Sequence, residues 1–531
     1  MYQDNFEDEL TGYINVDVVA DSYAAMDEYV DGEVAKELEE MKKQQKQQRY
    51  EKAQEQLQEG VEQIPAQVRD FIHLEERIMS FDNYCDLFNH ILNSEKPVEL
   101  ELPNKWLWDI IDEFIYQFQS FCTYRSNLSK KAADTIEVLK NNTAVWNTHS
   151  VLNVLYSLVA KSKICEQLQA SVNGQDPTVA AGEYGNCSLY KMLGYFSLVG
   201  LLRVHCMMGD YTLALQSLEN IELGNHRALF TRVPACHVTL YYYVGFSYLM
   251  MRRYSDATRI FANILTFILR TRQYQTRSFQ FDIVNKKADQ MYALMAICLA
   301  LSPTRVDEQI HSHLREKYGE QQSRMQRGGD DSLATFQELF LYACPKFISP
   351  NPPNYDAYLS SLSSSTANPN PTTSTSTSTS TSNPDTSNPN SNANQTFNRF
   401  ELQEFQMKIF MHEVSLQLIV PTLRSFLRLY TSMKLDKLAS FLDISPAELH
   451  TQLLVFKQRA SQLKWSGGPN LLDGLPSSIG DLGFAIDNDV VYIAENKVGR
   501  KYADWFIRNS AKIGDLVKNL ESNYLLPSST A

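Results

Sequence analysis

Residues 422–464 read TLRSFLRLYTSMKLDKLASFLDISPAELHTQLLVFKQRASQLK. Apolar side chains recur in this stretch at intervals of three and four residues, which predicts short amphipathic helices. Ser445 and Pro446 separate two of these helices, because serine suits the N-cap position and proline suits the first helical position. The stretch therefore predicts a small helical unit.

Residues 484–495 read FAIDNDVVYIAE, and their apolar residues no longer follow the helical period. Two short β-type runs, 484–486 and 490–493, flank residues 487–489, whose types favour a tight turn. A helix, a turn, a second helix and a β-hairpin in this order predict a winged helix.

The whole chain is long and rich in helical patterns. It has 531 residues, of which 44% are hydrophobic, so it can bury several cores or the continuous core of a repeat array. Alternating β patterns are rare before residue 484. We therefore expect a mainly α fold, in which a helical solenoid is closed by the winged helix.

The acidic charge is concentrated near the start of the sequence. The formal net charge is −13, and residues 1–60 contribute −10 of it, with 16 acidic and six basic side chains. The other residues are nearly neutral, which argues against a general polyanion-binding surface. We expect residues 1–60 to form a disordered acidic tail with a polar helix at 33–59.

Eight cysteines are spread through the chain, and no two lie closer than 19 residues apart. This spacing excludes a Cys-x-x-Cys zinc site and differs from a disulfide framework. Most of them fall inside apolar helical runs, where a free cysteine acts as a small hydrophobe. No basic leader and no long apolar run are present, so we expect a cytosolic or nuclear protein without a membrane segment, and we favour the cytoplasm.

Residues 209–221 and 253–264 form an internal repeat with an offset of 43 residues. Upstream of the second copy, Gly245 takes the place of the small residue in the tetratricopeptide pattern. Small residues at this place let two paired helices approach while large ones fill the gap beside them. The pattern predicts a tetratricopeptide-like solenoid over residues 61–300, an architecture that usually provides an extended binding surface.

Residues 346–399 interrupt the helical pattern with a tract rich in serine, threonine, asparagine and proline, which predicts a disordered insertion. Helical patterns on both sides, at 301–345 and 400–500, predict a second domain that ends in the winged helix. Residues 501–531 follow as a C-terminal helix and tail.

Residues 105–124 predict a helix with apolar residues on nearly all sides, buried between its neighbours. Its aromatic side chains have the shape to stack on nucleobases, although core packing is the commoner role. Asp109, Asp112 and Glu113 share one face of this helix. Because no histidine or glycine-rich loop accompanies them, a solvated or salt-bridged edge is favoured over acid-base or metal chemistry.

Catalytic motifs are missing from the sequence, which has no Walker A, Gly-x-Gly-x-x-Gly, Gly-x-Ser-x-Gly or His-Glu-x-x-His pattern. His311 and His313 resemble a metal-binding His-x-His pair, but Gln321 and Arg324 stand where a metal-dependent isopeptidase carries serine and aspartate. The pair also falls in a helical pattern, where side chains two residues apart diverge. We expect no enzyme activity, no metal and no cofactor.

Winged helices often bind DNA, but from residue 400 to the end the sequence has 14 basic and 14 acidic side chains. Specific DNA reading is therefore disfavoured, and weak RNA or ribosome contact stays open for a few basic residues of the last helix: Arg500, Lys501, Arg508, Lys512 and Lys518. The alternative is that they form the solvated face of that helix. Its buried face would then be Val498, Tyr502, Trp505, Phe506, Ile513, Leu516 and Leu520.

Several long runs carry a family resemblance, with tryptophans, tyrosines and glycines in a fixed order. They are LPNKWLWDIIDEFIYQFQSF at 102–121, GEYG at 182–185, YKMLGYFSLVGLLR at 190–203, YYYVGF at 241–246 and MMRRY at 250–254. These runs resemble the subunit L family of eukaryotic translation initiation factor 3, a family of PCI-domain proteins. The resemblance covers roughly residues 64–355 and 400–515 and would make residues 301–500 a PCI domain.

The resemblance implies a non-catalytic scaffold subunit of the initiation factor. Such a subunit would contact subunits K and E and would support preinitiation complex assembly on the small ribosomal subunit and recruitment of mRNA. No small-molecule substrate is implied. The alternatives are an autonomous RNA-binding winged-helix protein, or a PCI subunit of the proteasome lid or the COP9 signalosome.

Partner binding is expected at exposed apolar positions of the winged helix and the last helix. The candidates are Ile486, Val490, Tyr492 and Trp505. The hairpin at 484–493 would present a strand edge that can pair with a strand of another subunit.

Overall fold

The structure is a computed structural model that describes residues 66–524, apart from 129–130, 132, 225–227, 272–278, 357, 361–400, 419, 479–481 and 496. The predictions for the acidic tail and for most of the serine- and threonine-rich insertion lie outside the described residues. The chain divides into two units, Met1–Glu76 and Arg77–Ala531. Helix α4 (Ala66–Asn93) begins before the boundary between them, and the elements that follow α4 lie in the second unit.

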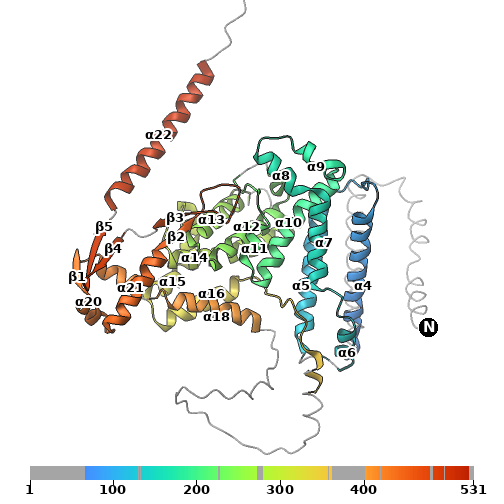
Figure 1. Cartoon of the computed structure of the whole chain (residues 1–531), viewed down its shortest axis with the longest axis horizontal. Coiled ribbons are helices and arrows are strands. Elements are labelled where there is room, and N and C mark those ends of the chain that lie inside the picture. The colour runs from blue at the N-terminus through green and yellow to red at the C-terminus, as the bar shows by residue number, and fades with distance from the viewer. Residues whose placement is uncertain are drawn as a thin grey trace, which may run out of the picture. The chain divides into compact units, whose positions relative to one another are not determined.

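Helices dominate the described chain, as the sequence predicts (Figure 1). Those of the first half are α5 (Asn104–Ser126), α6 (Ala133–Asn141), α7 (Thr148–Ser162), α8 (Ile164–Val172), α9 (Pro177–Asn186), α10 (Ser188–Met208), α11 (Tyr211–Gln216) and the 3-10 helix η2 (Leu229–Arg232). The middle contains α12 (Pro234–Met250), α13 (Tyr254–Thr271), α14 (Phe279–Leu301), α15 (Glu308–Arg327), α16 (Asp330–Ala343) and α18 (Glu401–Ser415).

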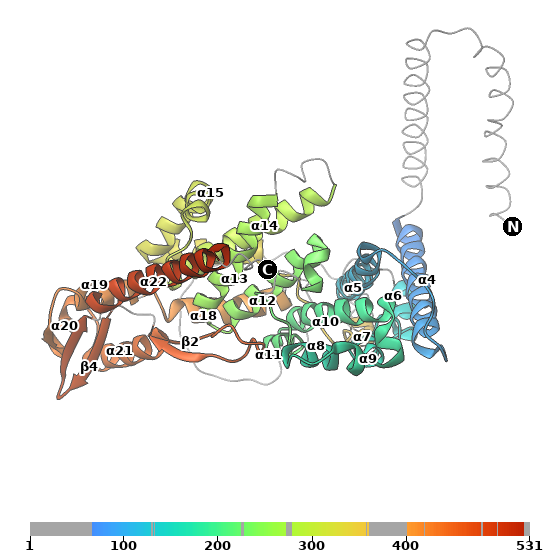
Figure 2. The same ribbon diagram turned by 90° about the horizontal axis from the view of Figure 1, so that it is seen from above.

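Helix α10 is buried on almost all sides and packs against α5, α7 and α12, between which it lies in both views (Figures 1 and 2). Two of its glycines explain the close approach. A Cβ atom at Gly194 would lie 2.0 Å from Ser162 Oγ of α7, and one at Gly200 would lie 2.9 Å from Ile115 Cδ1 of α5. The helix ends at Gly209, whose φ of 85° suits a residue without a Cβ.

The predicted pairing of small and large residues between α12 and α13 is confirmed. A Cβ at Gly245 of α12 would lie 2.4 Å from Phe261 Cε1 of α13, and Phe261 is fully buried. The two helices therefore meet as the tetratricopeptide pattern at Gly245 predicts.

The C-terminal module combines short helices with two small antiparallel sheets. Its elements are α19 (Val420–Leu427), β1 (Ser432–Lys434), α20 (Leu435–Leu442), α21 (Pro446–Ala460), β2 (Ser461–Lys464), β3 (Leu475–Ser478), β4 (Leu482–Asp487), β5 (Val490–Glu495) and α22 (Lys497–Tyr524). One sheet has the order β1-β5-β4, and β2 pairs with β3 in the other. The sequence did not predict β1, β2 or β3.

Local details of the module follow the sequence closely. Ser445 Oγ accepts a hydrogen bond from the backbone N–H of Glu448 at 3.2 Å, so it is the N-cap of α21, and Pro446 is the first residue of that helix. Asn488 and Asp489 adopt φ values of 48° and 59° in the turn between β4 and β5. Both are residue types that tolerate this left-handed region, which two-residue hairpin turns require.

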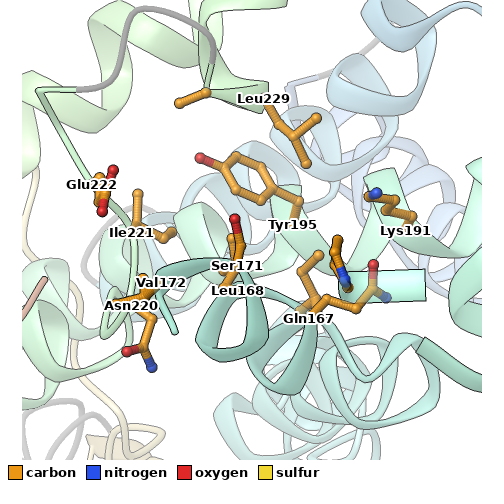
Figure 3. A pocket seen from close by; sticks show the side chains of 13 residues that line it. Gln167, Leu168, Ser171, Val172, Lys191, Tyr195, Asn220, Ile221, Glu222 and Leu229 are labelled. Carbon is orange, nitrogen blue, oxygen red and sulfur yellow. The ribbon is translucent and has the colours of Figure 1, made fainter. Parts of the chain in front are cut away.

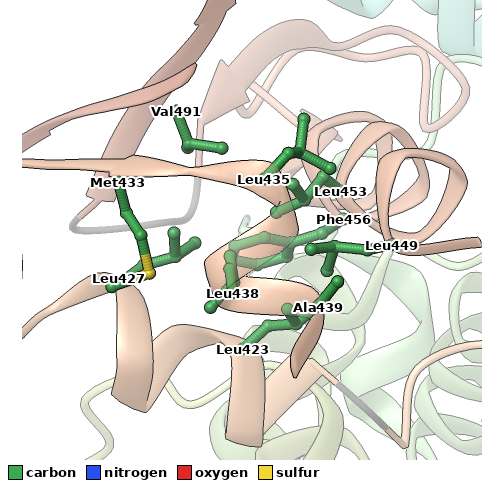
Figure 4. Packing of buried hydrophobic residues seen from close by; sticks show 10 residues of the cluster. All are labelled: Leu423, Leu427, Met433, Leu435, Leu438, Ala439, Leu449, Leu453, Phe456 and Val491. Atoms are coloured by element: carbon green, nitrogen blue, oxygen red, sulfur yellow. The ribbon is translucent and has the colours of Figure 1, made fainter. Parts of the chain in front are cut away.

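One hydrophobic core holds the module together (Figure 4). Side chains from three helices meet the inner face of the sheet there: Leu423, Leu427, Met433, Leu435, Leu438, Ala439, Leu449, Leu453, Phe456 and Val491. The core follows from the helical and β periods of the sequence, except at Met433, which lies on the unpredicted strand β1.

One prediction and one alternative about burial are wrong. In α5, Trp106 and Tyr116 are 59% and 55% exposed, so the helix is buried on one broad face and not on all sides. In α22, the apolar face that would be buried under one of the two alternatives for this helix is open. Its described members, which are Trp505, Phe506, Ile513, Leu516 and Leu520, are 54% to 64% exposed. The period identified each apolar face correctly, but a period does not state whether the same chain covers that face.

Candidate partner-binding surface

The predicted hairpin residues point to opposite faces of the three-stranded sheet. Ile486 is half-buried and packs against the module core, and Val490 is half-buried at the turn. Tyr492 is 51% exposed, because it alternates with the fully buried Val491 along β5. Of the three, Tyr492 is therefore the side chain that a partner can reach.

The register places small residues beside the Tyr492 ring. Tyr492 pairs with Ser432 of β1 on one side and with Ala485 of β4 on the other. A tyrosine that stands above short neighbours presents most of its ring, and tyrosine is one of the residues that carry the most binding energy at interfaces.

Only part of the hairpin can add a further strand. Strand β5 is the central strand, because its backbone already pairs with β1 and with β4. The edges of this sheet are β1, which has three residues, and β4, which has six. The strand edge predicted for the hairpin is therefore β4, and Val490 and Tyr492 contribute side chains and not an open edge.

The structure places the C-terminal candidates on α22. Trp505, Arg508 and Lys512 are exposed there. The side chains of Arg500 and Lys501 lie outside the described residues. The described members of the set thus leave the helix available both to an apolar and to an anionic partner.

A buried ion pair that was not predicted from the sequence connects the helical repeat to the module. Arg253 is 3% exposed and its Nε donates to Asp256 Oδ2 at 2.9 Å, at the start of α13. Its remaining N–H groups donate to three backbone carbonyls between β2 and β3, those of Leu471, Leu472 and Asp473, at 2.9 to 3.2 Å. We call this arrangement the Arg253 clamp.

The carboxylate of Asp256, which pairs with Arg253, binds the start of the same loop between β2 and β3. Asp256, 1% exposed, accepts the backbone N–H of Trp465 at 3.1 and 3.0 Å. Tyr248 donates its hydroxyl to the carbonyl of Leu471 at 2.8 Å, and the Arg253 guanidinium lies 4.8 Å from the centre of the Tyr248 ring. A guanidinium with five donors suits such a set of carbonyls, and a buried ion pair needs these extra hydrogen bonds to offset its desolvation.

A second polar link joins the repeat to α21. Glu413 of α18 pairs with Arg252 at 3.5 Å and with Arg459 of α21. Gln417 donates to the hydroxyl of Tyr254 at 3.2 Å. A cavity of about 300 Å³ between the helices and β2 is lined by Arg252, Arg253, Tyr254, Gln417 and Arg459, among other residues. The carboxylate and the carbonyls already bind the guanidinium groups of Arg252, Arg253 and Arg459 on the wall of this cavity.

A smaller cavity of about 190 Å³ lies among α8, α10 and the residues that follow α11 (Figure 3). Its polar lining consists of Gln167, Ser171, Lys191, Tyr195, Asn220 and Glu222. Burial raises the pKa of Tyr195 well above its usual range, so this phenol stays protonated. Sites for small ligands usually have 300 to 1,000 Å³, and the residues here include no pairing of a nucleophile with a base.

Lys287 of α14 is the clearest perturbed lysine in the second unit, with its Nζ 3.9 Å from the centre of the Tyr242 ring. Burial, and then the nearby Arg203 guanidinium, lower the pKa of Lys287 to about 7. A neutral lysine can act as a nucleophile. However, Lys287 lines neither of the two cavities. In the described part of the chain no three metal-ligating side chains gather into a metal site, and no helix is long and apolar enough to span a membrane.

Comparisons with known proteins agree with the reading of the sequence. A family model described as RNA polymerase I-associated factor PAF67 matches residues 76–513. The protein named eukaryotic translation initiation factor 3 subunit L from Mycosarcoma maydis is 50% identical over 451 residues, which are 85% of this chain and 63% of that protein. The protein of the same name from Aspergillus clavatus is 49% identical over 443 residues, which are 83% of this chain and 85% of that protein.

Proposed function

This chain belongs to the family of eukaryotic translation initiation factor 3 subunit L, and from that premise we propose that it is a scaffold subunit of the factor without a catalytic role. The observation that carries the proposal is the length of the match: the relatives align with more than four fifths of this chain, and the family model spans residues 76–513. In the cytoplasm, such a subunit would support preinitiation complex assembly on the small ribosomal subunit and recruitment of mRNA.

The module is, in this proposal, the winged helix of a PCI domain that extends over residues 301–500. Helices α20 and α21 followed by the β4–β5 hairpin support this, since they have the element order of a winged helix. The Arg253 clamp supports a functional consequence. It ties the repeat of residues 61–300 to the loop between β2 and β3, so a partner bound to the module is held in a fixed relation to the repeat.

Partner subunits would bind at three places on the module. Strand β4 offers backbone donors and acceptors to an added strand, while Tyr492 offers an aromatic ring on the outer face. Trp505 and the apolar face of α22 provide a third surface. By the resemblance of the sequence, the partners at these places are subunits K and E.

The family model carries a different name, which mentions RNA polymerase I. We favour the initiation factor because proteins from Mycosarcoma maydis and Aspergillus clavatus that align along most of this chain bear the name of its subunit L. A decisive test is affinity purification of the tagged full-length chain, followed by mass spectrometry. We expect the other subunits of translation initiation factor 3; recovery of RNA polymerase I or proteasome lid subunits in their place would refute the proposal.

Direct RNA binding is the second candidate function, and the exposure of Arg508 and Lys512 on α22 favours it. Charge reversal at both residues should then reduce salt-dependent binding of the purified chain to single-stranded RNA. Unchanged binding, or none at low salt, would remove this candidate and leave the scaffold role as it stands.

A further inference from the structure

Helix α5 presents an exposed stripe that the proposed scaffold function does not use. The stripe consists of Trp106, Asp109, Glu113 and Tyr116, which follow one another at intervals of three or four residues. Side chains at these intervals are neighbours on one helix face. At 1.5 Å of rise per residue, the stripe is about 15 Å long, with an aromatic ring at each end and two carboxylates between them.

The opposite face of α5 already supplies the core. Leu107, Trp108, Ile111, Phe114 and Ile115 are at most 2% exposed, whereas Trp106 and Tyr116 are 59% and 55% exposed. Packing within the second unit therefore does not account for these two rings. Exposed tryptophan and tyrosine beside polar residues are typical of binding surfaces.

Among the described residues, the two carboxylates of the stripe form no ion pair, although the Lys105 cation acts on Asp109. Asp112, one position away, is paired with Arg203 of α10. No ion pair in the described part of the chain involves Asp109 or Glu113, and Glu113 accepts only the amide of Gln117 at 3.0 Å among the hydrogen bonds found there. Partial burial raises the pKa of Asp109, while the cation of Lys105 opposes this and Asp112 adds to it. A carboxylate in such a setting gains stability from an added cation.

We propose that this stripe of α5 binds a lysine- and arginine-rich segment of a partner polypeptide. Each carboxylate pairs with one cation of that segment, and the rings of Trp106 and Tyr116 stack on guanidinium groups or cover the aliphatic stems. RNA is the poorer occupant, because Asp109 and Glu113 repel its phosphates.

The spacing of the carboxylates defines the occupant further. Asp109 and Glu113 are one helical turn apart, which is about 6 Å along the axis. Arginines at positions i and i+4 of a partner helix have the same spacing, and arginines at i and i+2 of an extended strand are about 7 Å apart. The surface therefore selects basic segments with one of these two patterns. This inference does not depend on the identity of the complex.

The test measures binding of the full-length chain to a fluorescent alanine-rich helical peptide with arginines at i and i+4. The same peptide with glutamate in place of arginine serves as the negative probe. We expect binding that weakens with salt. Trp106→Ala should weaken it about fivefold to tenfold, because an exposed cation–π contact is worth roughly 1 kcal/mol. Asp109→Lys with Glu113→Lys should weaken it at least about tenfold, because charges of like sign then face each other.

Matched controls lie elsewhere in the same chain. Phe405→Ala removes an aromatic ring of similar exposure from α18, and Asp134→Lys with Glu137→Lys reverses two exposed carboxylates of α6 one turn apart. Both controls should bind within about twofold of the unaltered chain. Equal loss in the α6 control would show diffuse attraction to an acidic protein and would overturn the proposal, as would unchanged binding in the stripe variants. If circular dichroism shows that a stripe variant is misfolded, Asp109→Asn with Glu113→Gln and Trp106→Phe take its place, with the same outcomes.

Discussion

In helix α13, Ile260, Phe261 and Ile264 are completely buried, whereas in helix α22, Phe506, Ile513 and Leu516 are 60% to 64% exposed. Both helices repeat apolar residues at three and four positions, so the sequence treats them alike. The difference lies in what the rest of the chain provides. Gly245 of α12 leaves room for the ring of Phe261. The described residues provide no such cover for the ring of Phe506, and an amphipathic pattern therefore indicates a contact without naming the molecule that makes it.

The largest expected difference in stability is between the phenylalanine-to-alanine substitutions in the two helices. Phe261→Ala should lower the free energy of unfolding by about 3 to 5 kcal/mol, because it opens a cavity beside Gly245. Phe506→Ala should change it by less than about 0.5 kcal/mol, because the ring contributes little to the fold of the isolated chain. Urea unfolding followed by circular dichroism measures both values. A large loss with Phe506→Ala would mean that α22 is packed within this chain in solution.

The ion pairs at the start of α13 allow a buried pair to be compared with an exposed one. Arg253→Ala should lower the free energy of unfolding by about 3 kcal/mol, because it leaves the carboxylate of Asp256 buried without its cation. Its neighbour Arg252 is half exposed and holds Glu413 at 3.5 Å, so Arg252→Ala should cost no more than about 1 kcal/mol. Thermal unfolding of the two variants compares them. Equal losses would show that the clamp contributes no more than a surface ion pair.

The buried Lys287 extends the comparison to charge and pH. Its pKa is about 7 in the fold and would be about 10.4 in the unfolded chain, so between these values only the unfolded chain binds the proton. The contribution of Lys287 to the free energy of unfolding therefore rises with pH over this window. Lys287→Met should stabilise the chain by about 1 to 3 kcal/mol at pH 6.5, less than the pKa difference implies, since the contact with Tyr242 favours the cation.

At pH 9.5 the stabilisation of the chain by Lys287→Met should be smaller than at pH 6.5. The control is Lys512→Met on α22, whose side chain is exposed, and it should show no pH-dependent difference from the unaltered chain. Urea unfolding at the two pH values measures both variants. A constant difference for Lys287→Met would show that its amine titrates in the fold as it does in water.

The sequence predicted those parts of the fold that depend on local pattern. The N-cap at Ser445, the turn at Asn488 and the fit of Gly245 against Phe261 each follow from neighbours within one or two elements. Apart from Met433, the residues of the module core follow from their period in the same way. Function followed from long runs that resemble a family, because the winged helix alone is shared by many proteins.

The Arg253 clamp and the open faces of α5 and α22 could not be predicted in this way. Arg253 binds the carbonyls of Leu471 and Leu472, more than two hundred residues away, and a carbonyl acceptor leaves no trace in the residue types of its segment. Whether the apolar faces of α5 and α22 are exposed depends on which other molecule binds over them. Of the candidate residues, Tyr492 was correctly placed on a strand, but its exposure depended on the register with Val491 buried beneath.

The smallest expected effect on stability, and the most direct test of an open face, concerns Tyr492. Tyr492→Thr removes the ring but keeps a residue that suits a strand, so the free energy of unfolding should change by about 0.5 kcal/mol. Recovery of partner subunits in affinity purification should nevertheless fall about tenfold, since a tyrosine at the centre of an interface contributes about 1 to 2 kcal/mol or more. Leu429→Thr is the control, because this side chain is 72% exposed at the end of α19 and lies outside the sheet. Unaltered recovery with Tyr492→Thr would assign partner binding to the β4 edge or to α22. Equal loss with Leu429→Thr would show that the partner also contacts apolar residues outside the sheet. The outer face of the sheet would then matter no more for binding than the other exposed apolar residues of the module.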